Sequence, residues 1–210
     1  MTLFRNTAAL ILCSLLALAW LSCGSERPSA QKRVVDGIDW STREGGDLIG
    51  EPLPQWEVDK WVTDRLPFGR VGKKVILVQF WSEDDVSRNT GYGLRSLDRE
   101  FGEAVDIISF YHPLPQPVTM APVNIARLAR QYRYKWSIVL DDRWFDLRKY
   151  WLRDKERSST FVTMIVGLDR TIRYVHVGEY RNDPSVPELK ATYDEIRDVI
   201  AELLAERDTT

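Results

Sequence analysis

Cysteine is almost absent from this chain of 210 residues. Its two cysteines are Cys13 and Cys23, and the stretch from Gly24 to Thr210 has none. That stretch therefore forms no internal disulfide and offers no thiolate nucleophile. Histidine is scarce as well, with only His112 and His176.

The chain also has no apolar run as long as the roughly 18 residues that cross a bilayer. Its most apolar stretch, Ala8 to Leu21, is interrupted by Ser14 and preceded by Arg5. A basic residue followed by a short apolar segment is typical of a signal peptide for export. The sequence therefore predicts a signal peptide over residues 1–22.

The apolar stretch ends in Trp20-Leu21-Ser22-Cys23-Gly24, which resembles the lipobox of bacterial lipoproteins. The usual pattern has leucine three residues before the cysteine, whereas this chain has Trp20 there. We expect Cys23 to be lipidated, so that the exported protein is membrane-anchored and faces the periplasm. The alternative is an ordinary signal peptide that is cut nearby, with no role for Cys23.

Neither sign of charge dominates. The chain has 29 Lys and Arg against 31 Asp and Glu, and removal of residues 1–22 takes away Arg5 and no acid, so the net charge goes from -2 to about -3. This balance gives no electrostatic case for binding nucleic acid or an anionic membrane surface. The membrane is expected as a partner only through the lipid on Cys23.

Residues 23–50 are polar and have little periodicity, which predicts the lipid-anchor cysteine and a tether before a folded body over residues 51–206. In the body, apolar segments alternate with segments of helical periodicity, and Gly167–Arg170 is a hairpin signal. This order predicts an α/β fold with a central mixed β-sheet flanked by helices. Strands are expected at 74–81, 105–110, 137–140, 161–166 and 172–177, and helices near 94–101, 125–132, 144–151 and 189–203.

Three segments resemble the thioredoxin-like redoxin family of the TlpA type. Gly72–Trp81 (GKKVILVQFW) is similar to the family's strand before its active site, Val139–Asp141 (VLD) to a later strand end, and Met164–Gly178 to the closing hairpin. The resemblance covers roughly residues 51–204 and implies a thioredoxin-like fold.

The family's two hallmarks of disulfide exchange are missing. In the family, the first strand leads to Cys-x-x-Cys at a helix N-terminus, where the dipole favours a thiolate. The matching positions here are Asp85 and Arg88, and Phe161 stands at the place of the cis-proline. Because a cis bond is costly without proline, a trans bond is expected before Phe161. The resemblance with these departures implies a redoxin-like protein that has lost thiol chemistry.

Other candidate sites have structural alternatives. The acidic run Glu83-Asp84-Asp85 could bind a cation, but three adjacent residues do not converge on one ion, so a helix N-terminal cap is favoured. Asp141 and Asp142 could complete a composite carboxylate site. A triad of Ser82, His112 and Asp141 lacks a supporting motif.

The aromatic residues between Tyr132 and Trp151 are expected mainly in the core, with a peptide groove as the alternative.

We therefore predict an exported, lipid-anchored thioredoxin-fold protein that binds an envelope protein without redox activity, metal or cofactor. The alternatives are a redoxin-class enzyme, either a thiol-disulfide oxidoreductase or a non-cysteine activity at Asp85, and a purely structural spacer. The predicted binding rim surrounds the former active site and consists of Trp81, Ser82, Glu83, Asp84, His112 and Thr160.

Overall fold

The computed structural model describes residues 34–35, 38–39, 42–56, 58 and 60–208. The predicted signal peptide, Cys23 and most of the predicted tether lie outside these residues. Two short strands, β1 (Val34–Val35) and β2 (Ile38–Asp39), pair antiparallel. Among the helices in the described residues, none is both long enough and apolar enough to cross a bilayer.

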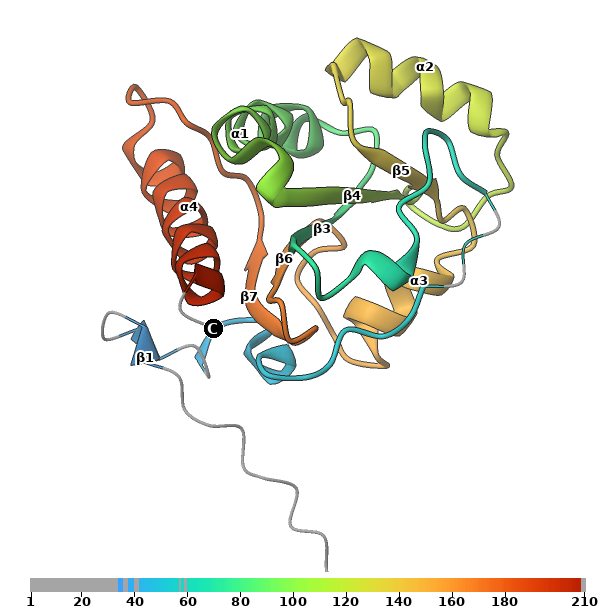
Figure 1. The fold of residues 1–210 in the computed structure, drawn as a ribbon. Helices are drawn as coiled ribbons and strands as arrows, with labels where there is room; N and C mark the ends of the chain where they lie inside the picture. Colours follow the sequence, from blue (N-terminus) through green and yellow to red (C-terminus); the bar gives the residue numbers. More distant parts are fainter. Residues whose placement is uncertain (1–33, 36–37, 40–41, 57, 59, 209–210) are drawn as a thin grey trace, which may run out of the picture. The chain divides into compact units, whose positions relative to one another are not determined.

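A five-stranded mixed sheet forms the centre of the body (Figure 1). β3, β4 and β5 are parallel, and β6 runs antiparallel to both β3 and β7. Every residue of β3 is buried, in agreement with the continuous apolar run that predicted it. The expected α/β fold with a mixed sheet is confirmed. In spatial order the strands are β5 (Ser137–Leu140), β4 (Val105–Tyr111), β3 (Val75–Trp81), β6 (Val162–Val166) and β7 (Ile172–Val177).

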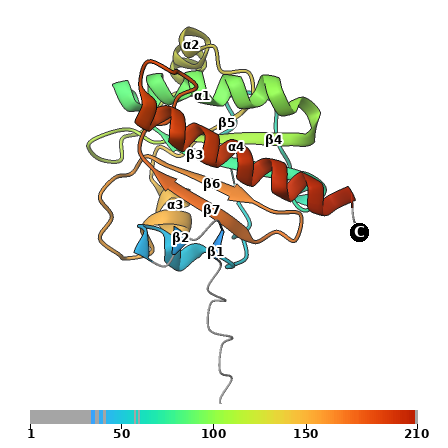
Figure 2. The same cartoon turned by 90° about the vertical axis from the view of Figure 1, so that its left-hand side faces the viewer.

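The helices connect the strands in the predicted order. α1 (Asp85–Phe101) joins β3 to β4, α2 (Pro122–Tyr132) joins β4 to β5, and α4 (Pro187–Asp208) follows β7. Figure 2 shows α4 lying across the sheet on the same side as α1. The expected aromatic helix is α3 (Phe145–Leu147), which continues into the π-helical turn η5 (Arg148–Leu152). Short 3-10 turns are η2 (Gly46–Leu48), η3 (Phe68–Arg70) and η4 (Gly102–Ala104).

The two faces of the sheet carry separate apolar cores because side chains alternate along each strand. Val75, Leu77 and Trp81 of β3 belong to the core that α1, α2 and α4 cover. The intervening Ile76, Val78 and Phe80 belong to the second core, which is covered by η5 and by the chain before β3. The same strand therefore anchors both layers, which fixes its carboxyl end firmly in place.

Residues 42–50, predicted as tether, are part of the body. Leu48 is fully buried, and Gly50 N–H donates to the carbonyl of Ile172 at 2.7 Å. Gly45 has φ 85°, and a Cβ there would lie 2.5 Å from Cγ1 of Val175, so only glycine allows this close approach. The body thus begins before Glu51, because this segment gains its contacts from distant strands rather than from its own periodicity.

Candidate functional site

The carboxyl ends of the parallel strands meet at one edge of the sheet, where open α/β sheets commonly bind ligands. Trp81 and Tyr111 are register partners at the ends of β3 and β4. His112 N–H donates to the carbonyl of Trp81 at 2.9 Å, and Asp141 N–H donates to the carbonyl of Tyr111 at 2.8 Å. The structure therefore brings the end of β3, His112 and Asp141 to the same edge, as the sequence predicted.

Asp84 closes the loop between β3 and α1. Its Oδ1 accepts the backbone N–H of Ser87 at 2.7 Å, and its Oδ2 accepts the hydroxyl of Ser82 at 2.7 Å. Ser87 Oγ in turn accepts the backbone N–H of Ser82 at 3.1 Å. Asp84 is thus the N-cap of α1. The favoured interpretation of the acidic run as a helix cap is confirmed for this residue.

The two positions that match the family cysteines lie in the first turn of α1. Asp85 is the first residue of the helix, and its side chain lies outside the described part of the chain. Arg88 is exposed, and its guanidinium lies 5.8 Å from the ring centroid of Tyr132. The first turn of a helix favours negative charge, so the backbone setting suits a carboxylate as it would suit a thiolate.

His112 lies beneath the surface at the end of β4. Its side chain is fully buried, and Nε2 is 2.8 Å from the hydroxyl oxygen of Thr160. Trp144 packs edge-on against the imidazole, with ring centroids 5.9 Å apart. Burial lowers the pKa of His112 to about 4, although the Asp84 carboxylate acts in the opposite direction. The ring is therefore neutral at pH 7, and within the described residues Nδ1 has no hydrogen-bond partner.

Phe161, which stands where the resemblance places a cis-proline, has an apolar side chain that is only 3% exposed. Its backbone N–H donates to Ser159 Oγ at 2.9 Å. The cis peptide bond found within the described residues is Leu114–Pro115, so the bond before Phe161 is trans, as expected. The loop before β6 is thus held by its own serine and by the apolar core beneath it.

Three predicted rim residues lie below the surface instead of on it. Trp81 and His112 have no exposed area, and Ser82 is 1% exposed. The Trp81 ring packs against Tyr111 and Tyr134 at centroid distances of 5.0 Å in both cases. The residues that remain accessible are Glu83, which is exposed, and Asp84 and Thr160, which are half-buried. The sequence could not reveal this, because neighbouring aromatic side chains from other elements cover the strand end.

Most of the clustered aromatic residues are in the core, as expected. Tyr132, Tyr134, Trp136, Tyr150 and Trp151 are all less than 10% exposed. Trp144 is half-buried, and Phe145 is 67% exposed. The buried members of the cluster therefore do not line a peptide groove.

The triad drawn from Ser82, His112 and Asp141 is not assembled. Ser82 is bonded to Asp84, and His112 to Thr160. Asp141 Oδ2 accepts the backbone N–H of Leu147 at 2.8 Å, and burial raises the pKa of Asp141 against the effect of this bond. Each member has a structural partner, so no proton relay connects them.

Asp142, the other half of the composite carboxylate site, is neutralised by a lysine. Lys60 Nζ lies 2.5 Å from its Oδ2, and the backbone N–H of Met120 donates to the same oxygen at 3.1 Å. Across the described residues, no group of three or more His, Asp or Glu side chains converges on a point suitable for a metal ion. The contacts of Asp141 and Asp142 are therefore with neighbouring parts of the chain that they help to hold in place.

His176 has a structural environment in β7. Its Nε2 lies 3.4 Å from the carbonyl oxygen of Glu179, and its ring packs edge-on against Tyr180. Burial lowers the pKa of His176 to about 4, so this ring is also neutral at pH 7. These contacts are consistent with a structural role for His176.

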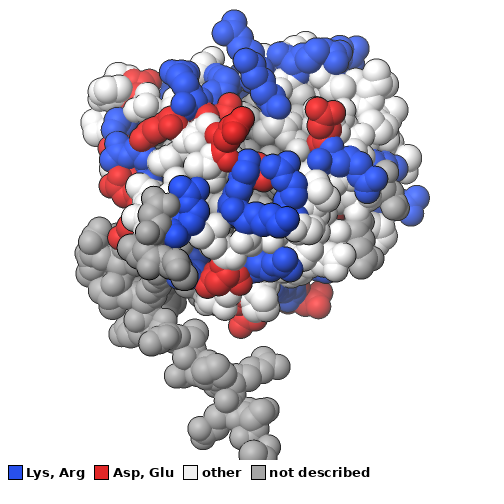
Figure 3. All heavy atoms as spheres, viewed as in Figure 1, with Lys and Arg blue, Asp and Glu red and all other residues white. Residues whose placement is uncertain are grey.

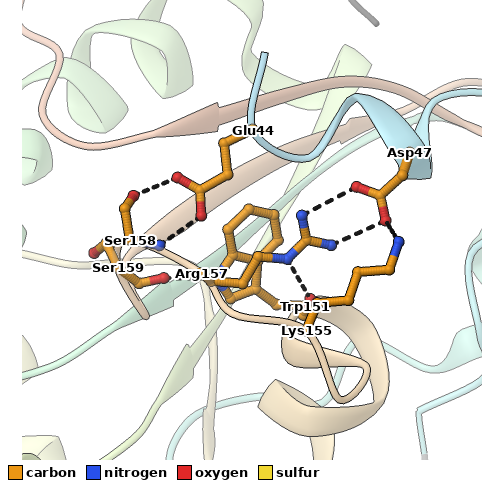
Figure 4. A network of polar contacts seen from close by, with 7 residues as sticks. All are labelled: Glu44, Asp47, Trp151, Lys155, Arg157, Ser158 and Ser159. Atoms are coloured by element: carbon orange, nitrogen blue, oxygen red, sulfur yellow. Dashed lines mark hydrogen bonds and ion pairs between the residues drawn. The ribbon is translucent and has the colours of Figure 1, made fainter. Parts of the chain in front are cut away.

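A polar network that the sequence did not predict holds the loop before Thr160 (Figure 4). The Arg157 guanidinium donates twice to Asp47, at 3.0 Å each, and stacks 4.2 Å from the Trp151 ring centroid. Glu44 accepts the backbone N–H of Ser158 at 2.6 Å and also the Ser158 hydroxyl. We call Glu44, Asp47, Lys155, Arg157 and Ser158 the clasp. It fastens residues 42–50 to the segment that leads to Thr160 and Phe161.

Comparison with solved structures identifies the fold. The chain is similar to a thiol-disulfide isomerase from Corynebacterium glutamicum (TM-score 0.53, 19% identity, 72% of this chain and 96% of the other). It is also similar to a thiol:disulfide interchange protein of the thioredoxin family from Chlorobium tepidum (TM-score 0.55, 8% identity, 73% of this chain and 95% of the other). A secreted thiol-disulfide isomerase from Corynebacterium glutamicum matches as well (TM-score 0.57, 10% identity, 73% of this chain and 85% of the other).

These similarities confirm the thioredoxin-like fold expected from the sequence. At such low identity they establish the architecture and leave activity open. No family model matches the chain, and no curated protein matches it.

Proposed function

We propose that this thioredoxin-fold chain is a binding or accessory module of the bacterial cell envelope that performs no thiol-disulfide exchange. The observation that carries the proposal is the absence of cysteine from residues 24–210 in a fold whose solved neighbours are named for thiol-disulfide chemistry. Without a thiolate, attack on a disulfide has no nucleophile.

The geometry of the former active site supports this proposal. In the loop that precedes α1, the Asp84 carboxylate accepts hydrogen bonds from Ser82 and Ser87, and Ser87 Oγ accepts the backbone N–H of Ser82. His112 is buried and neutral, so it does not serve as an accessible base at the surface. A site without a reactive thiol can still serve recognition, because function depends on the residues of the site and not on the fold alone.

The proposed location is the periplasmic side of a membrane, with the mature chain anchored by lipid on Cys23. Arg5 and the apolar stretch that follows it support export, and the Ser22-Cys23-Gly24 sequence supports lipidation. A secreted protein among the structural neighbours is consistent with export. The anchor would hold the domain close to envelope proteins and raise their effective concentration.

Site-specific photo-crosslinking in living cells tests the binding proposal. A photoreactive residue in place of Glu83 or of Thr160 places the probe at the accessible part of the rim. The matched control carries the probe in place of Glu202, which is exposed on α4. We expect one discrete envelope-protein adduct from both rim positions and none from the control. Absence of an adduct at both rim positions, or the same adduct at all three, contradicts binding through this surface.

A further inference from the structure

A groove between α1 and α2 adjoins the rim. α1 contributes Arg88, Tyr92 and Arg95, while α2 and the residue after it contribute Gln131 and Arg133, around a volume of about 480 Å³. Among the described side chains that line it, Glu83 is the one acid. Three guanidinium groups and one carboxylate therefore line the described part of this groove.

Contacts within the chain hold the side chains of the groove. Arg95 Nη1 donates to the carbonyl of Tyr132 at 2.6 Å, and its guanidinium lies 4.5 Å from the Tyr92 ring centroid. Tyr92 is 55% exposed, so it presents an aromatic face beside these charges. Burial is the main cause that lowers the pKa of Arg95; Arg133 and Arg99 add to this effect, while Tyr92 and Tyr134 oppose it. An anionic ligand would favour the charged form of this partly buried guanidinium.

The positive charge continues from the groove along α2. From Ile107 to Leu140 the chain has no Asp or Glu, and its basic residues are Arg127, Arg130, Arg133 and Lys135, all exposed. Within the described residues, no carboxylate forms an ion pair with Arg95, Arg130 or Arg133. Figure 3 shows basic side chains at the top of the face seen there, over α2, with basic and acidic side chains mixed below them.

We propose that the α1–α2 groove binds an acidic segment of a protein partner, with Asp or Glu carboxylates on the guanidinium groups. Arginine suits this task because its planar fork binds a carboxylate through two hydrogen bonds. The eleven residues of α2 span about 16 Å, the length of about five residues of extended chain. We call the exposed basic residues along and just after α2 (Arg127, Arg130, Arg133 and Lys135) the basic strip. A strip of this length exceeds what one small anion can occupy.

The position of α2 favours a protein over the membrane as the occupant. Figures 1 and 2 show α2 at one end of the body and residues 42–50 at the other. With the lipid proposed on Cys23, the chain reaches the body through residues 42–50, at the end away from α2, which leaves α2 accessible to a protein partner. The inference rests on the proposed binding function and adds the chemistry of the partner.

The test measures fluorescence anisotropy of labelled octa-glutamate, with octa-glutamine as the neutral probe. The protein is the mature chain isolated from cells in a nonionic detergent. The groove variant is Arg88→Gln/Arg133→Asn, because asparagine tolerates the left-handed backbone of residue 133 (φ 58°). The matched control is Lys73→Gln/Arg143→Gln, which removes the same charge from two exposed positions outside the groove. Each single groove substitution is measured as well, so that a folding defect in one does not decide the result.

We expect octa-glutamate, and not octa-glutamine, to bind, with a Kd that rises with ionic strength. The groove variant should raise this Kd about tenfold or more, and the control less than about twofold. Equal weakening by both double variants, or no binding of octa-glutamate, overturns the inference. So does complete displacement by inorganic phosphate, which indicates a small-anion site. Binding to anionic vesicles that needs Arg88 and Arg133, without peptide binding, would assign the strip to a lipid surface.

The two proposals fail independently. Rim crosslinks can persist when the groove variant binds octa-glutamate normally, and that result rejects the acidic partner alone. Loss of rim crosslinks with intact octa-glutamate binding rejects the rim and leaves the groove.

Discussion

His112 experiences two opposing electrostatic effects. Burial disfavours the imidazolium, whereas the Asp84 carboxylate favours it. Burial has the larger effect, so the pKa of His112 falls to about 4. The sequence placed this histidine correctly at the end of a strand beside the site. It could not show that the ring is buried, since the covering side chains, Trp144 and Thr160, come from segments far along the chain.

Lowered histidine pKa values predict acid sensitivity. His112 and His176 both have a pKa of about 4 in the fold, against about 6.5 in the unfolded chain. Between these values the unfolded state binds more protons, so stability is lost as the pH falls from 6.5 toward 4. We expect His112→Gln to remove roughly half of this loss, and this half is on the order of 2 kcal/mol. Urea denaturation at pH 7.5 and pH 4.5 measures the free energy of unfolding at each pH. If the difference between the two pH values is the same in the variant as in the original protein, the burial argument is contradicted.

The Asp84 cap predicts a stability change that its neighbour should not share. Asp84→Ala removes the acceptor for Ser87 N–H and for the Ser82 hydroxyl, which should lower the free energy of unfolding by about 1 kcal/mol. Glu83→Ala is the matched control, because Glu83 is exposed, and it should change stability by less than about 0.5 kcal/mol. Thermal or urea unfolding compares the two. Equal effects would mean that the cap does not stabilise α1.

At the scale of elements, the sequence was informative wherever an element has its own periodicity. The apolar run at 74–81 predicted β3 within one residue of its observed start, because a strand buried on both faces needs apolar side chains throughout. The hairpin of β6 and β7 and the helix α4 were predicted in the same way. These elements carry local signals that do not depend on their neighbours.

Residues 42–50 carry no such signal. Their contacts are with Val175, Ile172 and Arg157, more than a hundred residues further along the chain. A polar composition alone resembles a tether, so only the three-dimensional arrangement distinguishes a docked segment from a free one. The α1–α2 groove was missed for the same reason, since its arginines come from two helices that only tertiary packing brings together.

The clasp predicts local opening when Asp47 is neutralised. Hydrogen bonds from Arg157 and Lys155 hold the pKa of Asp47 at about 2 against the effect of burial, so its contribution to stability is lost progressively as the pH falls from 3.8 to about 2. Asp47→Asn should cost about 1 kcal/mol at pH 7 after allowance for solvent screening. Amide exchange in residues 44–50 should become faster, while exchange in β3 stays unchanged. The control is Asp64→Asn at an exposed position. Unaltered exchange in residues 44–50 would show that the clasp does not fasten this segment.

At the scale of the whole molecule, the proposed anchor and the basic strip have different roles. The N-terminal segment would fix the location of the protein, and α2 with its groove would select the partner. Overall net charge conceals this division, because 29 basic and 31 acidic residues nearly cancel. The uneven distribution of charged residues along the chain reveals the basic strip, which the net charge does not.

Lipidation of Cys23 is tested by the intact mass of the mature N-terminal peptide from the native host. We expect the chain to begin at Cys23 with a diacylglycerol adduct or a triacylated form. Replacement of Cys23 by Ser should abolish the adduct and release the protein from the membrane fraction. An unmodified N-terminus at another position would make the protein exported without an anchor.

Disulfide reduction by the mature chain carrying Cys23→Ser tests the central claim most directly. The reference is the same chain with Asp85→Cys and Arg88→Cys, which restores two thiols in the first turn of α1, where the helix favours a thiolate. The account predicts no reduction of insulin disulfides above background by the first protein, and a reversible disulfide with measurable thiol reactivity in the second. Turnover by the cysteine-free chain would contradict a non-redox module and would establish a catalytic group other than cysteine.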